Sequence, residues 1–385
     1  MFFTLIVIYC KDVNIFASIM IFLKKLNIAN FKNLKSVELS FKNKYICFAG
    51  NNGVGKTNLL DSIYYLSIGK SYFNSIDKQN ILHKENYFNL KGSYSRKDEN
   101  IEIFCAFTNR KKITINGNNL EKLSDIVGEI PIVIVTPYDN TLITGGSEER
   151  RRFLDMIISQ LDKNYLINLV EYNRTIKQRN AQLKILFENR SKDTSLIEVY
   201  NTKLIETGSF IFEKRKSFLE NFTTKFYNYY SIISENKEDV QIAYASQLKN
   251  NDFEEVLKSG FEKDLITQRS NFGIHKDDLE LFIFEHPAKK FASQGQQKSF
   301  LLALKLAQFD IIKEIKKIKP LFLLDDIFDR LDKNRATQLL DIITKNGYGQ
   351  IFLTDTNATR VNDVFKKIGK EIEIFNVENG NIINN

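Results

Sequence analysis

The chain has 385 residues, of which 43% are hydrophobic and 26% are charged, and its formal net charge is +8. This composition is typical of a folded protein with two or three domains and excludes disordered or fibrous chains. With only 17 glycines and 4 prolines, a collagen-like repeat is excluded as well. The cysteines Cys10, Cys47 and Cys105 form no CxxC pair. The sequence therefore predicts a reducing, cytoplasmic setting without a structural zinc site.

The first nineteen residues differ from the rest of the chain. The apolar run from Phe2 to Cys10 covers about half of the 20 residues that a spanning helix needs. No basic segment precedes the run, which disfavours a signal peptide. Met20 then begins a β-rich stretch. We expect residues 1–19 to be an upstream extension, and we expect no membrane association.

Residues 20–140 alternate β-rich runs with turns. One strong helical pattern interrupts them at Lys56–Ile68, and Asn116–Asn119 is a turn. The expected strands are Ile21–Ile28, Val37–Phe41, Tyr45–Ala49, Phe88–Tyr94, Ile101–Thr108 and Ile132–Val135.

Beyond Gly145 the sequence changes to long amphipathic helices that end near Glu235. A helix is expected from about Gln296, and strands at Val240–Tyr244, Leu279–Phe284, Leu321–Leu324 and Ile351–Thr354. We therefore expect an α/β fold: a split β-rich lobe with a mixed sheet, and an inserted, mostly helical lobe. The N-terminal half of the β-rich lobe is residues 20–140, the insertion is 141–285, and 286–385 returns to complete the lobe.

The strongest motif is a Gly-x-x-x-x-Gly-Lys-Thr loop between an apolar strand and a helix. Its glycines let backbone N–H groups converge on phosphate oxygens, at the positive end of the helix. Lys56 would reach the β- and γ-phosphates of ATP, and the Thr57 hydroxyl would bind Mg²⁺. The predicted nucleotide contacts in this segment are Gly50, Asn51, Asn52, Gly53, Val54, Gly55, Lys56, Thr57 and Asn58.

A second apolar strand ends in two acids, Asp325 and Asp326. The first would hold Mg²⁺ at the carboxyl end of the strand. The second is the candidate for orienting or deprotonating the attacking water, so Asp326 and Lys56 are the predicted catalytic residues.

A third motif precedes this strand by about thirty residues. Ser293 is a plausible N-cap for the following helix, whose N-terminus would bind an anion. The order of phosphate loop, long insertion, Ser-x-Gly-Gln and Asp-Asp resembles the ABC-type ATPases. The resemblance implies that Ser293, Gly295 and Gln296 of one protomer complete the nucleotide site of the other in an ATP-dependent homodimer.

Two more stretches fit that resemblance. Leu331-Asp332 resembles the loop that crosses the dimer interface, and Thr354-Asp355 lies where the switch region belongs. No histidine is present at the switch position, which departs from the transporter ATPases.

Within this superfamily the chain resembles the RecF family of bacterial recombination-mediator ATPases, from Met20 to near the C-terminus. One departure is Asp329-Arg330, where the family usually has Ser-Glu. The stretches that carry the resemblance are Leu26–Asn33, Gly50–Lys70, Thr136–Asp139, Glu149–Asp155, Gly273–Leu279 and Ser293–Gln297.

The resemblance implies a function in DNA replication, gap repair and recombination. An ATP-dependent dimer would bind duplex DNA and junctions of single- and double-stranded DNA without sequence specificity. It would promote RecA loading with RecR and RecO, and slow ATP hydrolysis would release the DNA.

Basic residues of the helical lobe are candidates for DNA contact. Three consecutive arginines, 150 to 152, cannot all face one groove, because helical neighbours point about 100° apart. Solvated surface charge is the competing explanation. The candidates are Arg150, Arg152, Lys177 and Arg179. The resemblance implies that His275 lies near the nucleotide or the dimer interface, and the alternative is that it stabilises a turn.

Three alternatives remain open. A soluble ABC ATPase subunit of a transporter is disfavoured by the 237 residues (293 − 56) between Lys56 and Ser293. An SMC-type chromosome-organising or end-processing ATPase would carry a long coiled coil, and this insertion is short and irregular. A nucleotide-binding scaffold without hydrolysis is disfavoured by Asp325 and Asp326.

Overall fold

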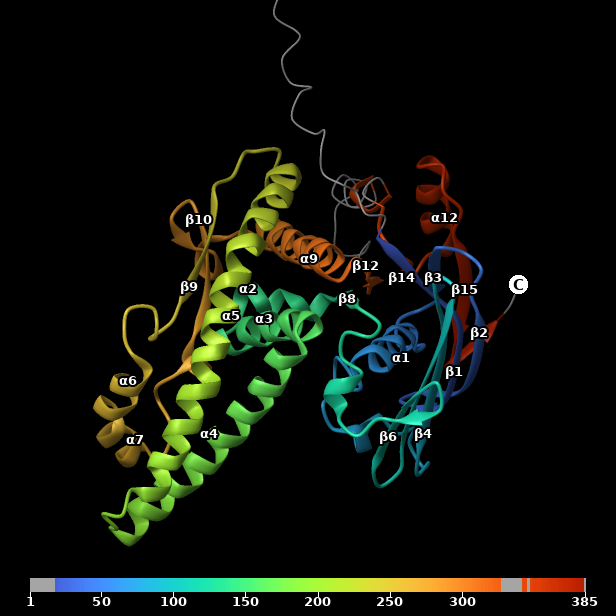
Figure 1. The fold of residues 1–385 in the computed structure, drawn as a ribbon. Helices are drawn as coiled ribbons and strands as arrows, with labels where there is room; N and C mark the ends of the chain where they lie inside the picture. The colour runs from blue at the N-terminus through green and yellow to red at the C-terminus, as the bar shows by residue number, and fades with distance from the viewer. Residues whose placement is uncertain (1–17, 327–340, 345–346, 384–385) are drawn as a thin grey trace, which may run out of the picture.

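The computed structural model describes residues 18–326, 341–344 and 347–383. A β-rich lobe and a helical lobe lie side by side (Figure 1). The β-rich lobe contains segments from both ends of the chain, and the helical lobe is built from the middle (Figure 1). Leu331-Asp332, expected to cross a dimer interface, and the departure at Asp329-Arg330 lie outside the described residues.

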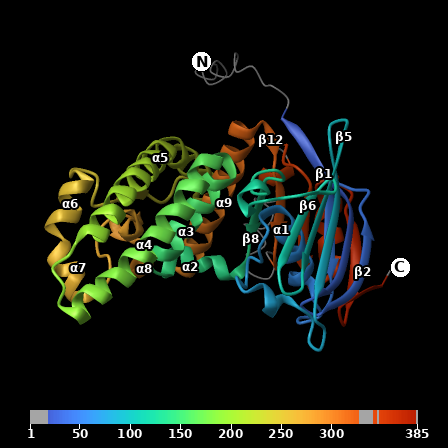
Figure 2. The ribbon, with the colours of Figure 1, turned by 60° about the horizontal axis from the view of Figure 1, so that its bottom comes forward.

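A sheet whose strands are antiparallel, except for the parallel pair β1 and β12, forms the outer layer of the β-rich lobe (Figure 2). Alternate residues of its strands are buried, as expected for a sheet with one face in the core. Its strands are β1 (Ile19–Phe31), β2 (Leu34–Ser40), β4 (Phe88–Arg96), β5 (Glu99–Phe107), β6 (Lys111–Ile115), β7 (Asn118–Asn119) and β12 (Ile318–Lys319).

A second sheet joins the two ends of the chain. Its order is β16-β15-β3-β14-β13-β8, and all neighbours are parallel except β15 and β16. Its two faces belong to different hydrophobic clusters, so the strands β3, β8 and β13 are apolar and buried throughout. The strands are β3 (Tyr45–Ala49), β8 (Ile132–Val135), β13 (Leu321–Leu324), β14 (Ile351–Asp355), β15 (Glu373–Glu378) and β16 (Asn381–Ile383).

Helix α1 (Lys56–Ile68) is buried between the two sheets of the β-rich lobe. Buried side chains lie around most of its circumference, as expected for a helix with sheets on both sides. Helix α12 (Ala358–Lys367) lies on the outer side of the lobe (Figure 1). The single turns η1 (Asp77–Asn80), η2 (Leu123–Asp125) and η3 (Pro137–Asn140) lie in its connections.

The helical lobe is centred on two long antiparallel helices, α4 (Lys163–Asn189) and α5 (Ser195–Ser234). Helix α9 (Gln294–Lys316) packs against α5 and belongs with this lobe, although it lies within the expected returning segment 286–385. The remaining elements are α2 (Thr141–Thr144), α3 (Ser147–Leu161), β9 (Val240–Ala245), α6 (Phe253–Ser259), α7 (Phe261–Thr267), η4 (Ile274–Lys276), β10 (Asp278–Ile283), β11 (His286–Pro287) and α8 (Ala288–Phe291).

The expected α/β architecture with a helical insertion is confirmed. Strand β1 begins at Ile19, which pairs with Ile318, so the last residue of the expected extension 1–19 is part of the sheet. Residues 1–17 lie outside the described part. Among the described residues, no helix has both the length and the apolar character needed to cross a membrane.

Candidate nucleotide site

The glycine-rich loop connects β3 to α1. Gly55 is the N-cap of α1 and has φ of 114°, a left-handed conformation that favours glycine. A Cβ atom at this position would also lie 2.9 Å from Oδ1 of Asn33, in the β1–β2 turn. The loop conformation therefore requires glycine here for two reasons, backbone torsion and close packing.

Lys56 is the first residue of α1 and is almost fully buried. Its ammonium donates hydrogen bonds to the carbonyl oxygens of Gly50, at 2.7 Å, and Asn51, at 2.9 Å. These contacts hold the charge inside the curve of the loop, beside the free N–H groups at the start of α1. A concentrated positive charge in a loop of this shape fits the phosphates of a nucleotide.

Thr57 and Asp325 meet although 268 residues separate them. The threonine Oγ1 lies 2.9 Å from Oδ1 and 3.1 Å from Oδ2 of the carboxylate. Asp325 follows the last residue of β13 and is buried. Burial, reinforced by the charge of Asp326, raises the pKa of Asp325 to about 6.

This pair of oxygen ligands suits Mg²⁺. Among the described residues, no cluster of three or more histidine, cysteine or acidic side chains could hold a metal ion without other ligands. Mg²⁺ commonly takes one or two protein oxygens and completes its shell with water and substrate phosphates. Thr57 and Asp325, next to the phosphate loop, therefore fit a nucleotide-bound Mg²⁺.

Thr354, at the end of β14, lies between the two acids. Its hydroxyl is 2.9 Å from Oδ1 of Asp325 and 3.3 Å from Oδ1 of Asp326, and it accepts the Asp326 backbone N–H at 2.8 Å. Asp326 has φ of 46°, so this backbone bond helps hold it in the left-handed region. The sequence placed Thr354 in a switch region but gave no sign that its hydroxyl contacts both carboxylates.

The motif at residues 293 to 296 forms the N-terminal cap of α9. Ser293 Oγ accepts the Gln296 N–H at 3.2 Å, and Gln296 Oε1 accepts the Ser293 N–H at 2.8 Å. The amide of Gln296 also donates to Glu238 at 3.1 Å. Ser293 is exposed, with Gly295 next to it on the first turn.

A cavity of about 290 Å³ lies beside Asp325, between the lobes. Ser293, Gly295 and Gln296 are absent from its lining, and so are the phosphate-loop residues 50–58, so this cavity adjoins the predicted site but does not contain it. Gln297 is present and accepts a hydrogen bond from Asn140 at 3.2 Å. The residues lining this cavity are Val135, Thr136, Pro137, Asn140, Gln294, Gln297, Lys298, Leu301, Leu302 and Asp325.

The DNA candidates have different environments. Arg179 is fully buried, and its guanidinium lies 2.7 Å from Asp264. The prediction of a DNA contact at Arg179 is therefore corrected: the side chain joins α4 to α7. Arg150 is also largely engaged, at 2.8 Å from Asp278. Arg152 and Lys177 are exposed.

His275 stabilises a turn of the helical lobe. Its Nδ1 lies 2.8 Å from the Tyr172 hydroxyl, and its Nε2 lies 3.0 Å from the Ser270 carbonyl oxygen. Burial lowers its pKa to about 4, so the ring is neutral at neutral pH. These contacts favour the structural one of the two roles considered for this histidine.

The fold and the site define an ABC-type ATPase head. The family model for the RecF/RecN/SMC N-terminal domain matches residues 22–382. A DNA replication and repair protein RecF from Bacteroides thetaiotaomicron is 44% identical over 93% of this chain and 97% of its own length. The corresponding protein from Flavobacterium johnsoniae is 43% identical over 92% and 99%.

Solved structures agree with the sequence relatives. The recombination mediator protein RecF-ATP in the RecFOR pathway has a TM-score of 0.85 and 30% identity, covering 94% of this chain and 97% of its own. An Smc head domain from Pyrococcus furiosus, at 18% identity and a TM-score of 0.54, shares the fold over 94% of this chain and 96% of its own. The chain belongs to the RecF family of DNA replication and repair proteins, and this confirms the resemblance seen in the sequence.

Proposed function

We propose that this protein is a slow, Mg²⁺-dependent ATPase whose ATP-bound homodimer binds DNA. One observation carries the proposal. Lys56, Thr57, Asp325 and Thr354 gather at the phosphate loop, whereas Ser293 is exposed on the other lobe and hydrogen-bonds within its own helix cap. An intact loop paired with an exposed anion-binding helix end is the arrangement expected when a second copy completes the site.

Different residues of the chain would bind the phosphates, activate the attacking water and hold Mg²⁺. Lys56 would bind the β- and γ-phosphates, and Asp326 would orient the attacking water or accept its proton. Mg²⁺, held by Thr57 and Asp325, would neutralise phosphate charge. Ser293 of the second copy would donate its hydroxyl proton to a phosphate oxygen, because its oxygen already accepts from Gln296 within the cap.

The DNA and protein partners follow from the family. The dimer would bind duplexes and single-strand/duplex junctions through their backbones, promote RecA loading with RecR and RecO, and release DNA after hydrolysis. The names of the relatives support a function in DNA replication and repair, and one of the similar solved structures is of RecF in the RecFOR pathway. Cys47 and Cys105 are both free thiols, which fits the cytoplasm.

Binding to a gapped duplex, measured by fluorescence anisotropy, tests the DNA part. Binding should require Mg²⁺-ATP, fail with ADP and with Lys56→Ala, and weaken as salt rises. Equal, weak binding under all conditions would contradict it. A blunt duplex of equal length serves as the comparison substrate.

Subunit mixing tests the shared site. Lys56→Ala and Ser293→Arg should each be inactive alone, but a mixed dimer keeps one intact site, formed by the loop of one copy and the Ser293 motif of the other. Random pairing should restore about a quarter of wild-type hydrolysis, since half of the dimers are mixed and half of their sites are intact. Mixing Lys56→Ala with Asp326→Asn is the matched control and should restore nothing, because both changes disable the loop side. Equal results from both mixtures would refute a shared site.

A further inference from the structure

A cavity of about 680 Å³ lies between the lobes, away from the phosphate loop. The far end of α1 forms one wall, with Lys70 just beyond the helix, and α3 and α4 form the opposite wall. Since α1 has 13 residues, its two ends are about 20 Å apart, so this cavity is separate from the nucleotide site.

Five basic residues line this cavity, and the fold uses two of them fully. Arg215 pairs with Asp155 at 2.8 Å and with Asp277 at 2.9 Å. Lys111 pairs with Asp77 at 2.8 Å and donates to the Gly69 carbonyl oxygen at 2.7 Å, which caps the C-terminus of α1. Lys70, Arg151 and Arg152 have no ion-pair partner among the described residues.

The lining offers little negative charge to balance these cations. Its carboxylates are Asp155 and Glu148, and Asp155 is already 2.8 Å from Arg215. Arg151 bonds only to a backbone oxygen, that of Asp277, at 2.6 Å. The cavity therefore keeps a net positive charge in a partly desolvated place.

The cations also repel one another. Burial lowers the pKa of Lys70, and Arg152 and Lys111 lower it further, although the Lys70 side chain still reaches solvent. Burial likewise lowers the pKa of Arg151, and the nearby Arg215 adds to this effect, although the carboxylates of Asp278, Asp155 and Asp277 partly oppose it. Holding like charges together in this way destabilises the fold, and a bound anion would relieve it.

A smaller cavity of about 430 Å³ shares Arg152 with the first and has aromatic walls. Phe73 and Tyr138 pack edge to face there, with ring centroids 5.8 Å apart, and Tyr138 is 69% exposed. An exposed aromatic ring beside cations is the combination on which unpaired bases stack in proteins that bind single strands. A free phosphate ion, unlike a base, has no flat face that could stack on such a ring.

We propose that these adjoining cavities bind one strand of DNA, with backbone phosphates at Lys70, Arg151 and Arg152 and an unpaired base against Tyr138. The proposal rests on the DNA-binding function proposed above and locates it between the lobes. Arginine matches the oxygens of a phosphate with paired N–H groups, which suits this place. A site for an unpaired base would favour gapped DNA over blunt duplex.

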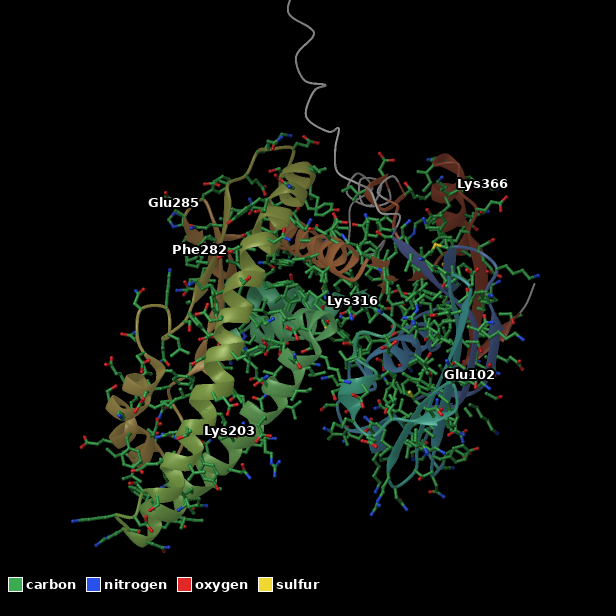
Figure 3. All side chains as sticks on the ribbon, in the orientation of Figure 1. Glu102, Lys203, Phe282, Glu285, Lys316 and Lys366 are labelled. Atoms are coloured by element: carbon green, nitrogen blue, oxygen red, sulfur yellow. The ribbon has the colours of Figure 1, made fainter. Side chains whose placement is uncertain are left out.

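The test compares Arg151→Gln/Arg152→Gln with a control that removes the same charge elsewhere. Lys366→Gln/Lys367→Gln is that control, since both lysines are exposed on α12. Figure 3 shows Lys366 on the side of the β-rich lobe away from the helical lobe. Each is titrated with gapped and blunt duplex in Mg²⁺-ATP at several salt concentrations, after thermal melting has shown that it is folded.

The arginine variant should bind gapped DNA at least tenfold more weakly, because each lost charge-assisted contact is worth about tenfold. The slope of log K against log salt should fall by about 2, or about 0.9 for each lost phosphate contact. The control should stay within about twofold of wild type. Equal losses in both variants would overturn the proposal, since only net charge would then matter.

Tyr138→Ala isolates the base contact. It should weaken binding to gapped DNA by roughly tenfold, the value of one base stacked on an aromatic ring, and leave blunt duplex unchanged. Equal weakening on both substrates would overturn the base contact.

Inorganic tripolyphosphate, added to Lys56→Ala protein, separates the two sources of phosphate. If the two arginine substitutions abolish tripolyphosphate binding but leave DNA binding intact, the cavity binds a free polyphosphate and the DNA assignment is overturned. If the wild-type protein binds no DNA with any nucleotide, the proposed function itself is contradicted. If the wild-type protein binds DNA and the arginine variant binds it equally well, only the proposed location of the DNA strand is contradicted.

Discussion

Lys305 of α9 and Asp139 of η3 form a buried ion pair between the two lobes, 3.0 Å apart. The carboxylate also accepts hydrogen bonds from the Tyr72 hydroxyl and the Thr136 backbone. Tyr72 is in turn tied through its own backbone to Asp61 of α1, at 2.7 Å. A continuous polar connection therefore links the helix after the phosphate loop to the helix that begins with the Ser293 motif.

Lys305→Met should strongly destabilise the protein. It leaves the Asp139 carboxylate buried without its partner, which should lower the free energy of unfolding by about 3–5 kcal/mol. Urea unfolding measures this change. Lys298→Met, the same substitution on the same helix at a partly exposed position, should cost under about 1 kcal/mol. Comparable losses of unfolding free energy in the two variants would show that the ion pair contributes little. Adding Asp139→Asn to Lys305→Met should recover part of the lost stability, because the buried carboxylate charge is then removed.

Thr354→Val should slow hydrolysis while ATP still binds. The substitution keeps the shape of the side chain but removes the hydroxyl that contacts both Asp325 and Asp326. Loss of such a positioning contact typically costs about 10- to 100-fold. Single-turnover hydrolysis gives the rate, and a fluorescent ATP analogue gives the affinity. Thr354→Ser restores the hydroxyl and should recover the rate; a slow serine variant would point to packing instead.

Asp326→Asn should separate nucleotide binding from hydrolysis. If Asp326 activates the water, the turnover rate should fall by about 10²–10⁴-fold, while ATP-dependent binding to DNA persists or lasts longer. Asp325→Asn should instead weaken Mg²⁺-dependent ATP binding, because Asp325 contacts Thr57. A colorimetric assay of phosphate release and a measurement of DNA dissociation rates would distinguish the two variants. The same defect in both variants would contradict the separate roles.

His275 should make stability depend on pH. Its pKa is lowered from 6.5 to about 4, so the unfolded state binds the proton more readily. Its stabilising contribution is complete above pH 6.5 and lost as the pH falls toward 4, up to about 3 kcal/mol in all. Asp325, whose pKa is raised from 3.8 to about 6, has the opposite effect on stability: its contribution increases as the pH falls through this range.

The measurement must therefore compare variants rather than follow the wild type alone. Urea unfolding of His275→Gln and wild type at pH 7 and pH 5 gives the difference. The histidine variant should lose less stability than wild type between these pH values. An equal loss would assign the pH dependence to other groups.

Local patterns predicted much of this structure. The helix Lys56–Ile68 and the strands Tyr45–Ala49, Ile132–Val135 and Leu321–Leu324 have the same bounds in sequence and structure. Each strand is an apolar run with clear boundaries, and the helix directly follows the glycine-rich loop, so neighbouring residues were sufficient to define them. The glycine-rich loop was recognisable for the same reason, since strand, loop and helix are consecutive.

Contacts between distant residues could not be predicted. Arg179 looked like a surface charge until its partner Asp264, 85 residues later, was placed beside it. The pairing of Lys305 with Asp139 spans 166 residues, and the position of Thr354 depends on which strands are neighbours. Helical periodicity contains no information of this kind, because burial of a charge depends on the partner that tertiary packing supplies.

The order of strands in the parallel sheet has a consequence for synthesis of the chain. Strand β3, which leads into the phosphate loop, pairs only with β14 and β15 among the described strands. The first of these begins 302 residues (351 − 49) after β3 ends. At about 5–20 residues per second, the ribosome needs about 15–60 s to make that stretch. During this time β3 has no partner in its sheet, while the helices made next can already pack, so the nucleotide site is among the last parts of the protein to form.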